Sequence, residues 1–263
     1  IEKEPSVLVE LVPPSLQSAV VIPARTASTR LPEKLLLRET GQSVLEHTYS
    51  AASAAVRPMG VWVAAGDEHI VREVQRFGGR VEQTDPGLSS GTDRVAELAQ
   101  RKEFRHFDIL VNVQGDEPEI DPCVIDRLIE RLENHPEAEM ATLAAPITED
   151  AIFLDPACVK VVCDATGRAL YFSRAPIPHR REPSDGAFEN RPLMHLGIYA
   201  YRREALLRFA ALPPSPLEQC ERLEQLRAVE AGFIIALEVV AEATCGIDTA
   251  EDYARFVARQ KSA

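Results

Sequence analysis

Residues 19–23 read Ala19-Val-Val-Ile-Pro23, a short apolar run rich in β-branched residues that ends at a proline. Such a run is typical of a buried strand. Two comparable runs follow, at 60–65 and at 107–113, and each predicts another buried strand. More polar segments separate the three runs, so the chain alternates between strand-forming and polar stretches.

The segments between these strands carry apolar residues at helical spacing. They predict helices over 43–55, 67–77, 92–102 and 121–134, with short strands over 80–83 and 140–145. Alternation of strand and helix at short intervals is typical of a parallel sheet covered by helices. We therefore expect an α/β fold: a mostly parallel nucleotide-binding sheet with helices on both faces.

The pattern changes from about residue 159. Two short strands over 159–163 and 169–173 predict an antiparallel hairpin, and the polar stretch 179–191 lacks periodicity and predicts a loop. The rest predicts strands over 196–201 and 233–240 and helices over 202–211, 217–231 and 249–261. We expect an extension over 1–17 and a single domain over 18–263, with an antiparallel insertion at about 155–215.

The overall negative charge argues against some classes of binding partner. The chain of 263 residues has 29 Lys and Arg against 41 Asp and Glu, a formal net charge of −12. This argues against nucleic acid or an anionic membrane surface as partner. The longest near-apolar run, 233–241, is about half the ~20 residues that a membrane span needs. An anionic ligand therefore requires a local cluster of positive charge.

Cysteine usage points to the cytoplasm. The chain has five cysteines, an odd number, and none are spaced as Cys-x-x-Cys. We interpret them as reduced, buried thiols of a cytoplasmic protein rather than as a disulfide, zinc or redox framework.

The segment after the first strand is locally basic. Within 25–38, Arg25, Arg30, Lys34 and Arg38 face a single acid, Glu33, so this stretch has a charge of +3. It leaves the carboxyl end of a strand, where open α/β sheets bind ligands. Its small residues would let phosphate oxygens approach backbone N–H groups; these are Ala24, Ala27, Ser28 and Thr29. Neither a Walker A nor a Gly-x-Gly-x-x-Gly pattern occurs, so a solvated basic loop stays an open alternative.

Acidic residues follow two other predicted strands. Asp116 and Glu117 come after the strand over 107–113, and Asp248 comes after the strand over 233–240. Carboxylates at strand ends can hold Mg²⁺ while leaving positions for water and substrate phosphate. Taken singly, each acid could instead belong to a capped turn. Together with the basic loop they favour metal-assisted phosphoryl or nucleotidyl transfer.

Residues 87–91 match the Gly-x-Ser-x-Gly pattern of a hydrolase nucleophile. Asp85-Pro86 separates the preceding short, polar strand from the serines, which is unfavourable for the sharp turn that such a nucleophile needs. We interpret Ser90-Gly-Thr92 instead as a helix N-terminus whose N–H groups can bind a ligand. A serine hydrolase remains the less favoured reading.

Polar side chains of the later strands offer a possible sugar site. His195 and Tyr199 alternate onto one face of their strand, and this face could line a sugar pocket or be an ordinary exposed surface. Arg174 and Arg180-Arg181 flank the polar loop and could bind a carboxylate. The six histidines do not form a metal-binding pattern.

Seven segments in order resemble the 3-deoxy-manno-octulosonate cytidylyltransferase (CMP-Kdo synthetase) family over roughly 18–259. They read Val21-Ile-Pro-Ala-Arg-Thr-Ala-Ser-Thr-Arg-Leu-Pro-Glu-Lys34, Ser90-Gly-Thr-Asp-Arg94, Asn112-Val-Gln-Gly-Asp-Glu-Pro118, Leu170-Tyr-Phe-Ser-Arg-Ala-Pro-Ile-Pro178, His195-Leu-Gly-Ile-Tyr-Ala-Tyr-Arg202, Ser215-Pro-Leu-Glu-Gln-Cys-Glu-Arg-Leu-Glu-Gln-Leu-Arg227 and Gly246-Ile-Asp-Thr-Ala-Glu-Asp252. The resemblance implies a cytoplasmic, Mg²⁺-dependent homodimer. It would make CMP-Kdo and pyrophosphate from CTP and Kdo, a 2-keto-3-deoxy sugar acid, for lipopolysaccharide assembly. Activation of another 2-keto sugar acid, such as 8-amino-Kdo or a nonulosonic acid, and a non-catalytic nucleotide-sugar sensor are the alternatives.

The resemblance also implies a role for individual residues. The catalytic set would be Arg25, Arg30, Lys34, Asp116 and Asp248, of which Asp116 and Asp248 would ligate Mg²⁺. The nucleotide would contact Ala24, Arg25, Ser28, Arg30, Lys34, Ser90, Gly91 and Arg94. The sugar acid would contact Gln114, Arg174, His195, Tyr199, Glu224 and Gln225.

The chain departs from the family pattern at four places. Glu33 stands where the family usually has Gly, Leu35 replaces a Pro, and Ser89 replaces a Gln. Ala64-Ala-Gly66 stands in place of the common Ala-Thr-Asp after the second strand. The departures at 33, 35 and 89 lie beside the predicted phosphate and nucleotide contacts.

Overall fold

The computed structural model describes residues 16–28, 30–179, 192–242 and 246–262. Nearly all of the predicted extension over 1–17 and most of the predicted loop over 179–191 lie outside the described residues. The same holds for Thr29, Arg180, Arg181 and Cys245. Among the described residues, no helix is long and apolar enough to cross a membrane.

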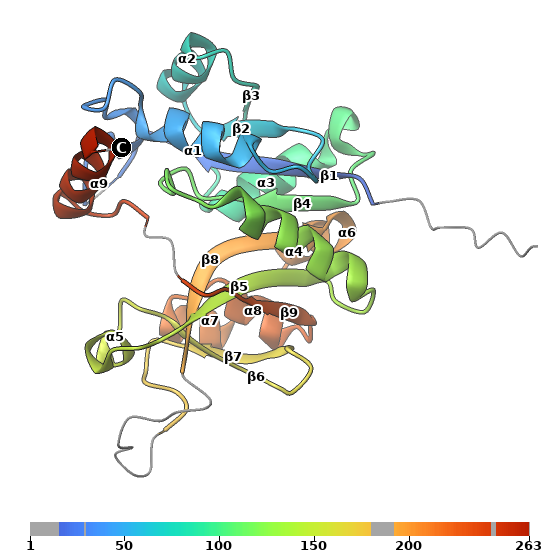
Figure 1. Cartoon of the computed structure of the whole chain (residues 1–263). Helices are drawn as coiled ribbons and strands as arrows, with labels where there is room; N and C mark the ends of the chain where they lie inside the picture. The colour runs from blue at the N-terminus through green and yellow to red at the C-terminus, as the bar shows by residue number, and fades with distance from the viewer. Residues whose placement is uncertain (1–15, 29, 180–191, 243–245, 263) are drawn as a thin grey trace, which may run out of the picture.

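A twisted sheet forms the centre of the molecule (Figure 1). Its strands lie in the order β3 (Val81–Gln83), β2 (Val61–Ala65), β1 (Ser18–Ala24), β4 (Ile109–Asn112), β8 (Leu193–Arg202), β5 (Met140–Pro146) and β9 (Ile235–Val239). β1 runs parallel to β2 and β4, β2 to β3, and β5 to β9. β8 runs antiparallel to both of its neighbours, β4 and β5. The predicted α/β fold with a mostly parallel sheet and helices on both faces is confirmed.

The alternation of side chains along β1 builds a core on each face of the sheet. Val20 and Ile22 point to one face and Ala19 and Val21 to the other, and all four are fully buried. The first face packs against α1 (Val44–Ser53), α2 (Glu68–Arg76), α4 (Pro122–Asn134) and α9 (Ala250–Ser262). The second packs against α3 (Gly91–Gln100), α6 (Arg203–Ala210) and α8 (Gln225–Glu230). β1 is therefore buried on both sides, which explains its continuous apolar sequence.

Part of the stretch predicted as an insertion completes the central sheet. The chain leaves β5 through a short helix, α5 (Asp150–Leu154), and forms the predicted hairpin of β6 (Lys160–Cys163) and β7 (Ala169–Ser173). It then returns as β8 between β4 and β5. β6 also pairs with the first residues of β8, so the hairpin extends the lower half of the sheet (Figure 1).

The single helix predicted over 217–231 is wrong. The structure has two short helices there, α7 (Pro216–Glu221) and α8, separated by Arg222 in the left-handed conformation at φ 54°. The break exposes backbone carbonyl groups, and the guanidinium of Arg174 donates to the carbonyl oxygens of Glu221 (2.7 Å) and Arg222 (3.3 Å). Arg174 directly follows β7 and is distant in sequence from this break. Its hydrogen bonds satisfy carbonyl groups that a continuous helix would pair internally.

Polar side chains begin several of the predicted helices. Asp67, Ser90 and Asp121 each accept a backbone N–H at the start of a helix. The four described cysteines are free thiols, as predicted. Their expected burial is wrong, because Cys123 and Cys220 are exposed and Cys158 and Cys163 are only partly buried.

Candidate active site

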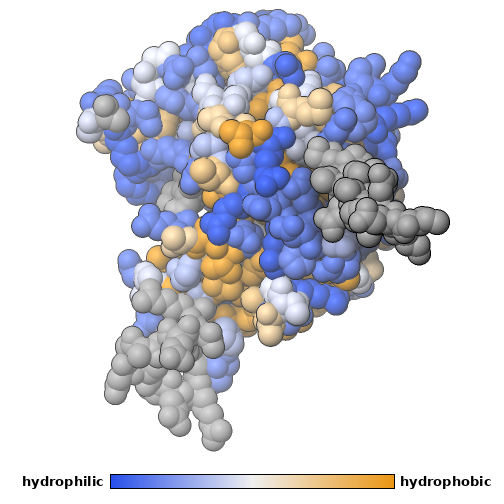
Figure 2. Space-filling view, turned by 45° about the vertical axis from the view of Figure 1, so that its right-hand side comes forward, coloured by the Kyte–Doolittle hydropathy of each residue, from blue (hydrophilic) through white to orange (hydrophobic). Residues whose placement is uncertain are grey.

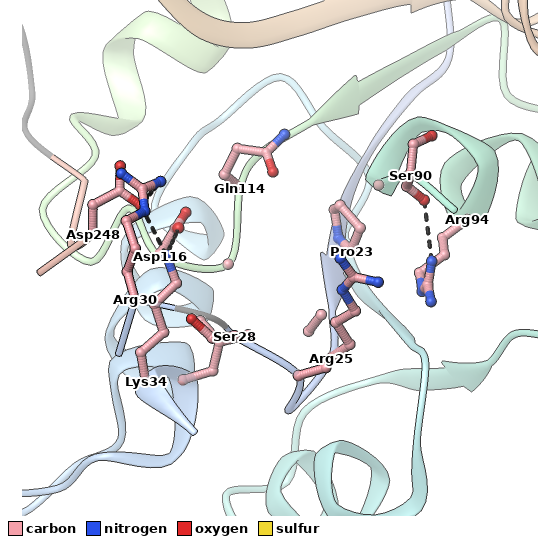
Figure 3. A pocket seen from close by; sticks show the side chains of 15 residues that line it. Pro23, Arg25, Ser28, Arg30, Lys34, Ser90, Arg94, Gln114, Asp116 and Asp248 are labelled. Carbon is pink, nitrogen blue, oxygen red and sulfur yellow. Dashed lines mark hydrogen bonds and ion pairs between the residues drawn. The ribbon is translucent and has the colours of Figure 1, made fainter. Parts of the chain in front are cut away.

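A pocket of about 540 Å³ opens at the carboxyl ends of β1 and β4 (Figure 3). Four parts of the chain line it: Pro23, Ala24, Arg25, Ala27, Ser28, Arg30, Lys34, Leu35, Ser90, Gly91, Arg94, Gln114, Gly115, Asp116 and Asp248. Every residue that the resemblance placed in the catalytic or nucleotide-binding set is in this wall. The three predicted motifs therefore meet at one edge of the sheet, where open α/β folds bind ligands.

One end of the pocket holds a compact group of charges. The Lys34 ammonium forms an ion pair with Asp116, donates to Asp248 Oδ1 (3.2 Å) and donates to the carbonyl oxygen of Ile247 (2.9 Å). Arg30 Nη2 donates to the same Asp248 oxygen at 3.0 Å. Figure 3 shows these side chains grouped together, with Arg25 and Ser28 toward the middle of the pocket. The two acids and two cations offset one another, so the group is stable before any ligand arrives.

Backbone contacts place Asp248 beside Asp116, although the two residues are 132 positions apart in the sequence. The N–H of Ile247 donates to the carbonyl oxygen of Asp116 at 2.8 Å. The turn that follows is fixed by Asp252, whose Oδ2 accepts from the backbone N–H groups of Asp248 (3.1 Å) and Thr249 (2.9 Å). The cap interpretation and the metal interpretation of this segment are therefore compatible, since Asp252 and Thr249 form the cap and leave the Asp248 carboxylate facing the pocket.

The oxygen atoms around Lys34 Nζ match what Mg²⁺ requires. Two carboxylates and one carbonyl converge on a single point, and an open cavity lies beside them. Mg²⁺ typically takes one or two carboxylates from a protein and completes its octahedron with water and substrate phosphate. Among the described residues, no cluster of three or more His, Cys, Asp and Glu side chains forms a dedicated metal cage. Asp116 and Asp248 therefore fit a Mg²⁺ ion that enters together with a phosphate ligand.

The other end of the pocket is the start of α3. Ser90 caps this helix in a reciprocal capping box with Asp93, and Gly91 follows at its first turn. A Cβ at Gly91 would lie 3.0 Å from Cγ of Pro23, so glycine favours the close approach of α3 to β1. The hydroxyls of Ser89 and Ser90 are both engaged by Asp93, at 2.9 and 3.0 Å. The predicted helix start is confirmed, and ligand binding by its N–H groups stays a prediction. Ser89, the serine of the hydrolase pattern, donates to the Asp93 carboxylate rather than to a histidine.

Arg94 lies behind this helix start and is almost fully buried. Its Nη1 donates to the carbonyl oxygens of Leu88 (3.0 Å) and Ser90 (3.1 Å), while its Nε has no hydrogen-bond partner among the described residues. Burial and the nearby Arg25 lower the pKa of Arg94, although a guanidinium stays protonated in proteins. A buried cation with an unsatisfied N–H at the wall of a pocket favours an anionic ligand there.

Most residues predicted for the sugar acid lie outside the pocket wall. Only Gln114 lines it, whereas Arg174, His195, Tyr199, Glu224 and Gln225 do not. His195 and Tyr199 form an aromatic row along β8, with ring centroids 5.4 Å apart, and Phe172 of β7 packs edge-on against His195. Tyr201 stacks on Tyr199 farther along β8, and Glu224 lies near both tyrosines. We call His195, Tyr199, Tyr201 and Glu224 the β8 cluster.

Burial favours the neutral forms of the side chains in the β8 cluster. It lowers the pKa of His195 to about 3 and raises the pKa values of Tyr199, Tyr201 and Glu224. The Thr92 hydroxyl, one residue beyond Gly91, donates to Glu224 Oε2 at 2.7 Å and so joins the β8 cluster to the start of α3. Sequence reasoning did not assign Thr92 this link, although its place in Ser90-Gly-Thr-Asp-Arg94 is a signal that could have found it.

The departures from the family pattern have local consequences. Glu33 is in the left-handed region at φ 51°, which is the conformation that glycine adopts without strain. Leu35 is buried and packs beside Gly115. A Cβ added at Gly115 would lie 3.2 Å from Cδ1 of Leu35. At Gly66 a Cβ would lie 2.8 Å from Arg94 Nε, so this position accepts no larger residue unless Arg94 moves.

Comparison with known proteins agrees with the geometry of the pocket. The cytidylyltransferase family model matches residues 19–239. A protein of Rhodopirellula baltica named 3-deoxy-manno-octulosonate cytidylyltransferase is 48% identical over 251 residues, which cover 94% of this chain and 100% of the relative. The chain belongs to the 3-deoxy-manno-octulosonate cytidylyltransferase family. The resemblance found from the sequence is confirmed, and the chain is a nucleotidyltransferase.

One further curated relative and two solved structures are also similar to this cytidylyltransferase. A protein of Shewanella woodyi named 8-amino-3,8-dideoxy-manno-octulosonate cytidylyltransferase is 44% identical, covering 89% of this chain and 94% of the relative. A solved structure of CMP:2-keto-3-deoxy-manno-octonic acid synthetase complexed with CTP superposes with a TM-score of 0.87 at 40% identity, covering 94% and 99% of the two chains. A 4-diphosphocytidyl-2C-methyl-D-erythritol synthase of Anaerococcus prevotii, 12% identical with a TM-score of 0.60, covering 94% and 99%, shares the fold.

Proposed function

We propose that this cytidylyltransferase joins the CMP part of CTP to the 2-hydroxyl of 3-deoxy-D-manno-octulosonate (Kdo) and releases pyrophosphate. The observation that carries the proposal is the meeting of the basic loop, both strand-end acids and the start of α3 in one pocket. The solved relative at 40% identity holds CTP. Its name and those of two curated relatives specify this sugar acid or its 8-amino form.

The reaction is an in-line displacement at the α-phosphorus of CTP. The hydroxyl oxygen forms a bond to phosphorus while the bond to the β-phosphate oxygen breaks; the hydroxyl proton passes to solvent and pyrophosphate leaves. Arg30 and Lys34 stand where they can balance the negative charge that develops on the triphosphate. Their ion pairs with Asp248 and Asp116 hold both cations beside the pocket until a ligand binds.

We propose Mg²⁺ as the cofactor, held by Asp116 and Asp248. When bound there, it would neutralise phosphate charge and lower the pKa of the attacking hydroxyl. Lys34 then moves from the carboxylates to the phosphates, because the ammonium and the metal require the same oxygen atoms. Removal of the metal with EDTA should abolish pyrophosphate release, and added MgCl₂ should restore it.

We propose His195, Tyr199 and Glu224 of the β8 cluster, with Gln114 and Gln225, as the binding surface for the sugar acid. A neutral surface of imidazole, phenol and protonatable carboxyl groups suits the hydroxyls of a sugar better than it suits phosphate. Gln114 lies in the pocket wall, and Thr92 connects Glu224 to the helix start at the nucleotide end. Arg174 donates to three backbone carbonyls, so its contribution would be to position the α7–α8 break.

The decisive experiment is mass-spectrometric detection of a CMP-sugar after incubation with CTP, Mg²⁺ and Kdo. A product of the expected mass supports the proposal. Binding of CTP without turnover of any sugar acid would indicate a non-catalytic sensor and refute it.

An 8-amino-Kdo transferase is the second candidate, because a relative at 44% identity carries that name. Parallel assays with Kdo, 8-amino-Kdo and a nonulosonic acid separate the candidates through the ratio of their kcat/KM values. A higher kcat/KM with 8-amino-Kdo would replace the first candidate by the second.

We also propose a cytoplasmic homodimer that supplies lipopolysaccharide assembly. The lower half of the molecule in Figure 2, which contains the β6–β7 hairpin and β9, displays an apolar patch. Exposed apolar side chains in that half include Leu154, Leu170 and Val239. Light scattering coupled to size-exclusion chromatography tests the dimer, and a monomer at micromolar concentration would contradict it.

A further inference from the structure

Asp67 bonds to two separate segments through its two carboxylate oxygens. Oδ1 accepts from the backbone N–H groups of His69 (3.0 Å) and Ile70 (3.2 Å) and so caps α2. Oδ2 accepts from the backbone N–H of Thr26 (2.7 Å) and from its hydroxyl (3.0 Å). Thr26 lies in the basic loop directly after Arg25, so the second oxygen holds a residue of the candidate phosphate site.

The neighbouring backbone supports this link. Gly66 donates its N–H to the carbonyl oxygen of Ala24 at 2.8 Å, which continues the pairing of β1 with β2 beyond the strands. A Cβ at Gly66 would lie 3.2 Å from the Cβ of Arg25 and 2.8 Å from Arg94 Nε. The segment 66–67 therefore supports the start of the basic loop at Arg25. It also lies beside the buried Arg94 at the other end of the pocket.

The chemistry of the contact requires a carboxylate. Burial disfavours the charged form of Asp67, but four hydrogen bonds from Thr26, Ile70 and His69 outweigh it and lower the pKa of the carboxyl. The group is ionised at neutral pH and accepts all four N–H and O–H donors. An amide at this position has only one acceptor oxygen, so it can satisfy one of the two segments but not both.

We propose that Asp67 is a positioning residue that fixes the phosphate-binding loop of this enzyme through Thr26. It touches no substrate; it acts by holding the backbone from which Arg25 and Ser28 project into the pocket. The inference rests on the proposed function of the pocket as a CTP site. It assigns a role in nucleotide binding to a residue outside the pocket wall, on α2.

The alternative is that Asp67 serves only as the cap of α2. Asp67→Asn separates the two roles, since Asn caps a helix as well as Asp does but offers Thr26 an N–H donor in place of an acceptor. If the cap were the whole role, Asp67→Asn would behave like the wild type. If Asp67 positions the loop, the variant keeps its stability and loses affinity for CTP.

The test compares the wild type, Asp67→Asn, Asp67→Ala and Thr26→Val by steady-state kinetics and by calorimetric binding of CTP with Mg²⁺. For Asp67→Asn we expect the KM and the Kd for CTP to rise about tenfold, as is typical when a charged hydrogen-bond partner is lost, with a smaller change in kcat. Its melting temperature should match that of the wild type. Thr26→Val, which loses only the hydroxyl bond, should show a smaller rise. Asp67→Ala should show the same rise in KM and also a lower melting temperature.

Asp121→Asn is the matched control, because Asp121 caps α4 through the backbone N–H of Cys123 and lies outside the pocket wall. Its KM for CTP should equal that of the wild type. An unchanged KM and Kd for CTP in Asp67→Asn would overturn the inference. Failure of the wild type itself to bind CTP would refute the proposed function instead, so the two failures are distinguishable.

Discussion

Two regions of the molecule differ in how they hold ionisable side chains. One is the pocket at the ends of β1 and β4, and the other is the β8 cluster. In the pocket, Lys34, Arg30, Asp116 and Asp248 are at least partly exposed and form ion pairs with one another. In the β8 cluster, burial favours the neutral forms of histidine, tyrosine and glutamic acid alike. One region is arranged for a highly charged ligand and the other for the hydroxyl groups of a sugar.

This difference explains how an acidic chain can bind a triphosphate. The net charge of −12 is spread over the whole sequence, whereas the basic loop concentrates positive charge at the one edge of the sheet that carries the pocket. The hydrogen bond from the Thr92 hydroxyl to Glu224 joins the two regions. Variants in each region should therefore affect different substrates.

The largest effect is expected from Asp116→Asn. The change removes a carboxylate of the proposed Mg²⁺ site, and loss of one preorganised charge typically lowers the rate on the order of 10²–10³-fold. Pyrophosphate release measures the loss, and circular dichroism should show an unchanged fold.

The matched control is Asp108→Asn at the opposite end of β4, where the carboxylate accepts the backbone N–H of Gln17 at 2.8 Å. It should retain the wild-type rate. Near-normal turnover in Asp116→Asn would remove Asp116 from the metal site.

Glu224→Gln should disturb the sugar acid and spare CTP. The amide keeps an acceptor for Thr92 but cannot ionise, and we expect kcat/KM for the sugar acid to fall about tenfold while the KM for CTP stays constant. Glu230→Gln, at the other end of α8, serves as control. A change in the KM for CTP alone would assign Glu224 to the nucleotide end.

His195 makes stability depend on pH. Its pKa falls from 6.5 to about 3 on folding, so between these values the unfolded chain binds one more proton than the folded chain. Stability must then decrease as the pH falls through this window, by up to about 2 kcal/mol at pH 5. Urea unfolding of wild type and His195→Gln at pH 7 and pH 5 measures the effect. A smaller decrease is expected for His195→Gln, and equal decreases would show that His195 takes up a proton in the fold.

The smallest effect concerns Glu33. Its left-handed backbone costs roughly 1–2 kcal/mol, and the flexibility of glycine offsets part of this, so Glu33→Gly should raise the free energy of unfolding by up to about 1 kcal/mol. Loss of the negative charge beside Lys34 should also lower the KM for CTP modestly. Arg222→Gly, at φ 54° and outside the pocket wall, should give the stabilisation without the change in KM. Identical KM values in both variants would contradict the electrostatic part of the prediction.

Local patterns predicted most of the elements correctly. β1 and α4 follow their apolar periodicity, and the Ser43, Asp67 and Ser90 caps begin their helices because the signals for them lie within a few residues. The helix over 217–231 was wrong because its break depends on Arg174, which reaches the carbonyls of α7 from β7. No pattern within α7 and α8 could contain that contact.

The sequence by itself determined the fold class, the basic loop and the two strand-end acids, since each depends on neighbours in the chain. Only the tertiary structure decided that β8 lies antiparallel between β4 and β5, that Asp248 meets Asp116, and that Asp67 holds Thr26. These facts depend on strand pairing and on backbone hydrogen bonds between segments far apart in sequence. Such contacts form only when both partners are in place, so neither segment carries a local sign of the other.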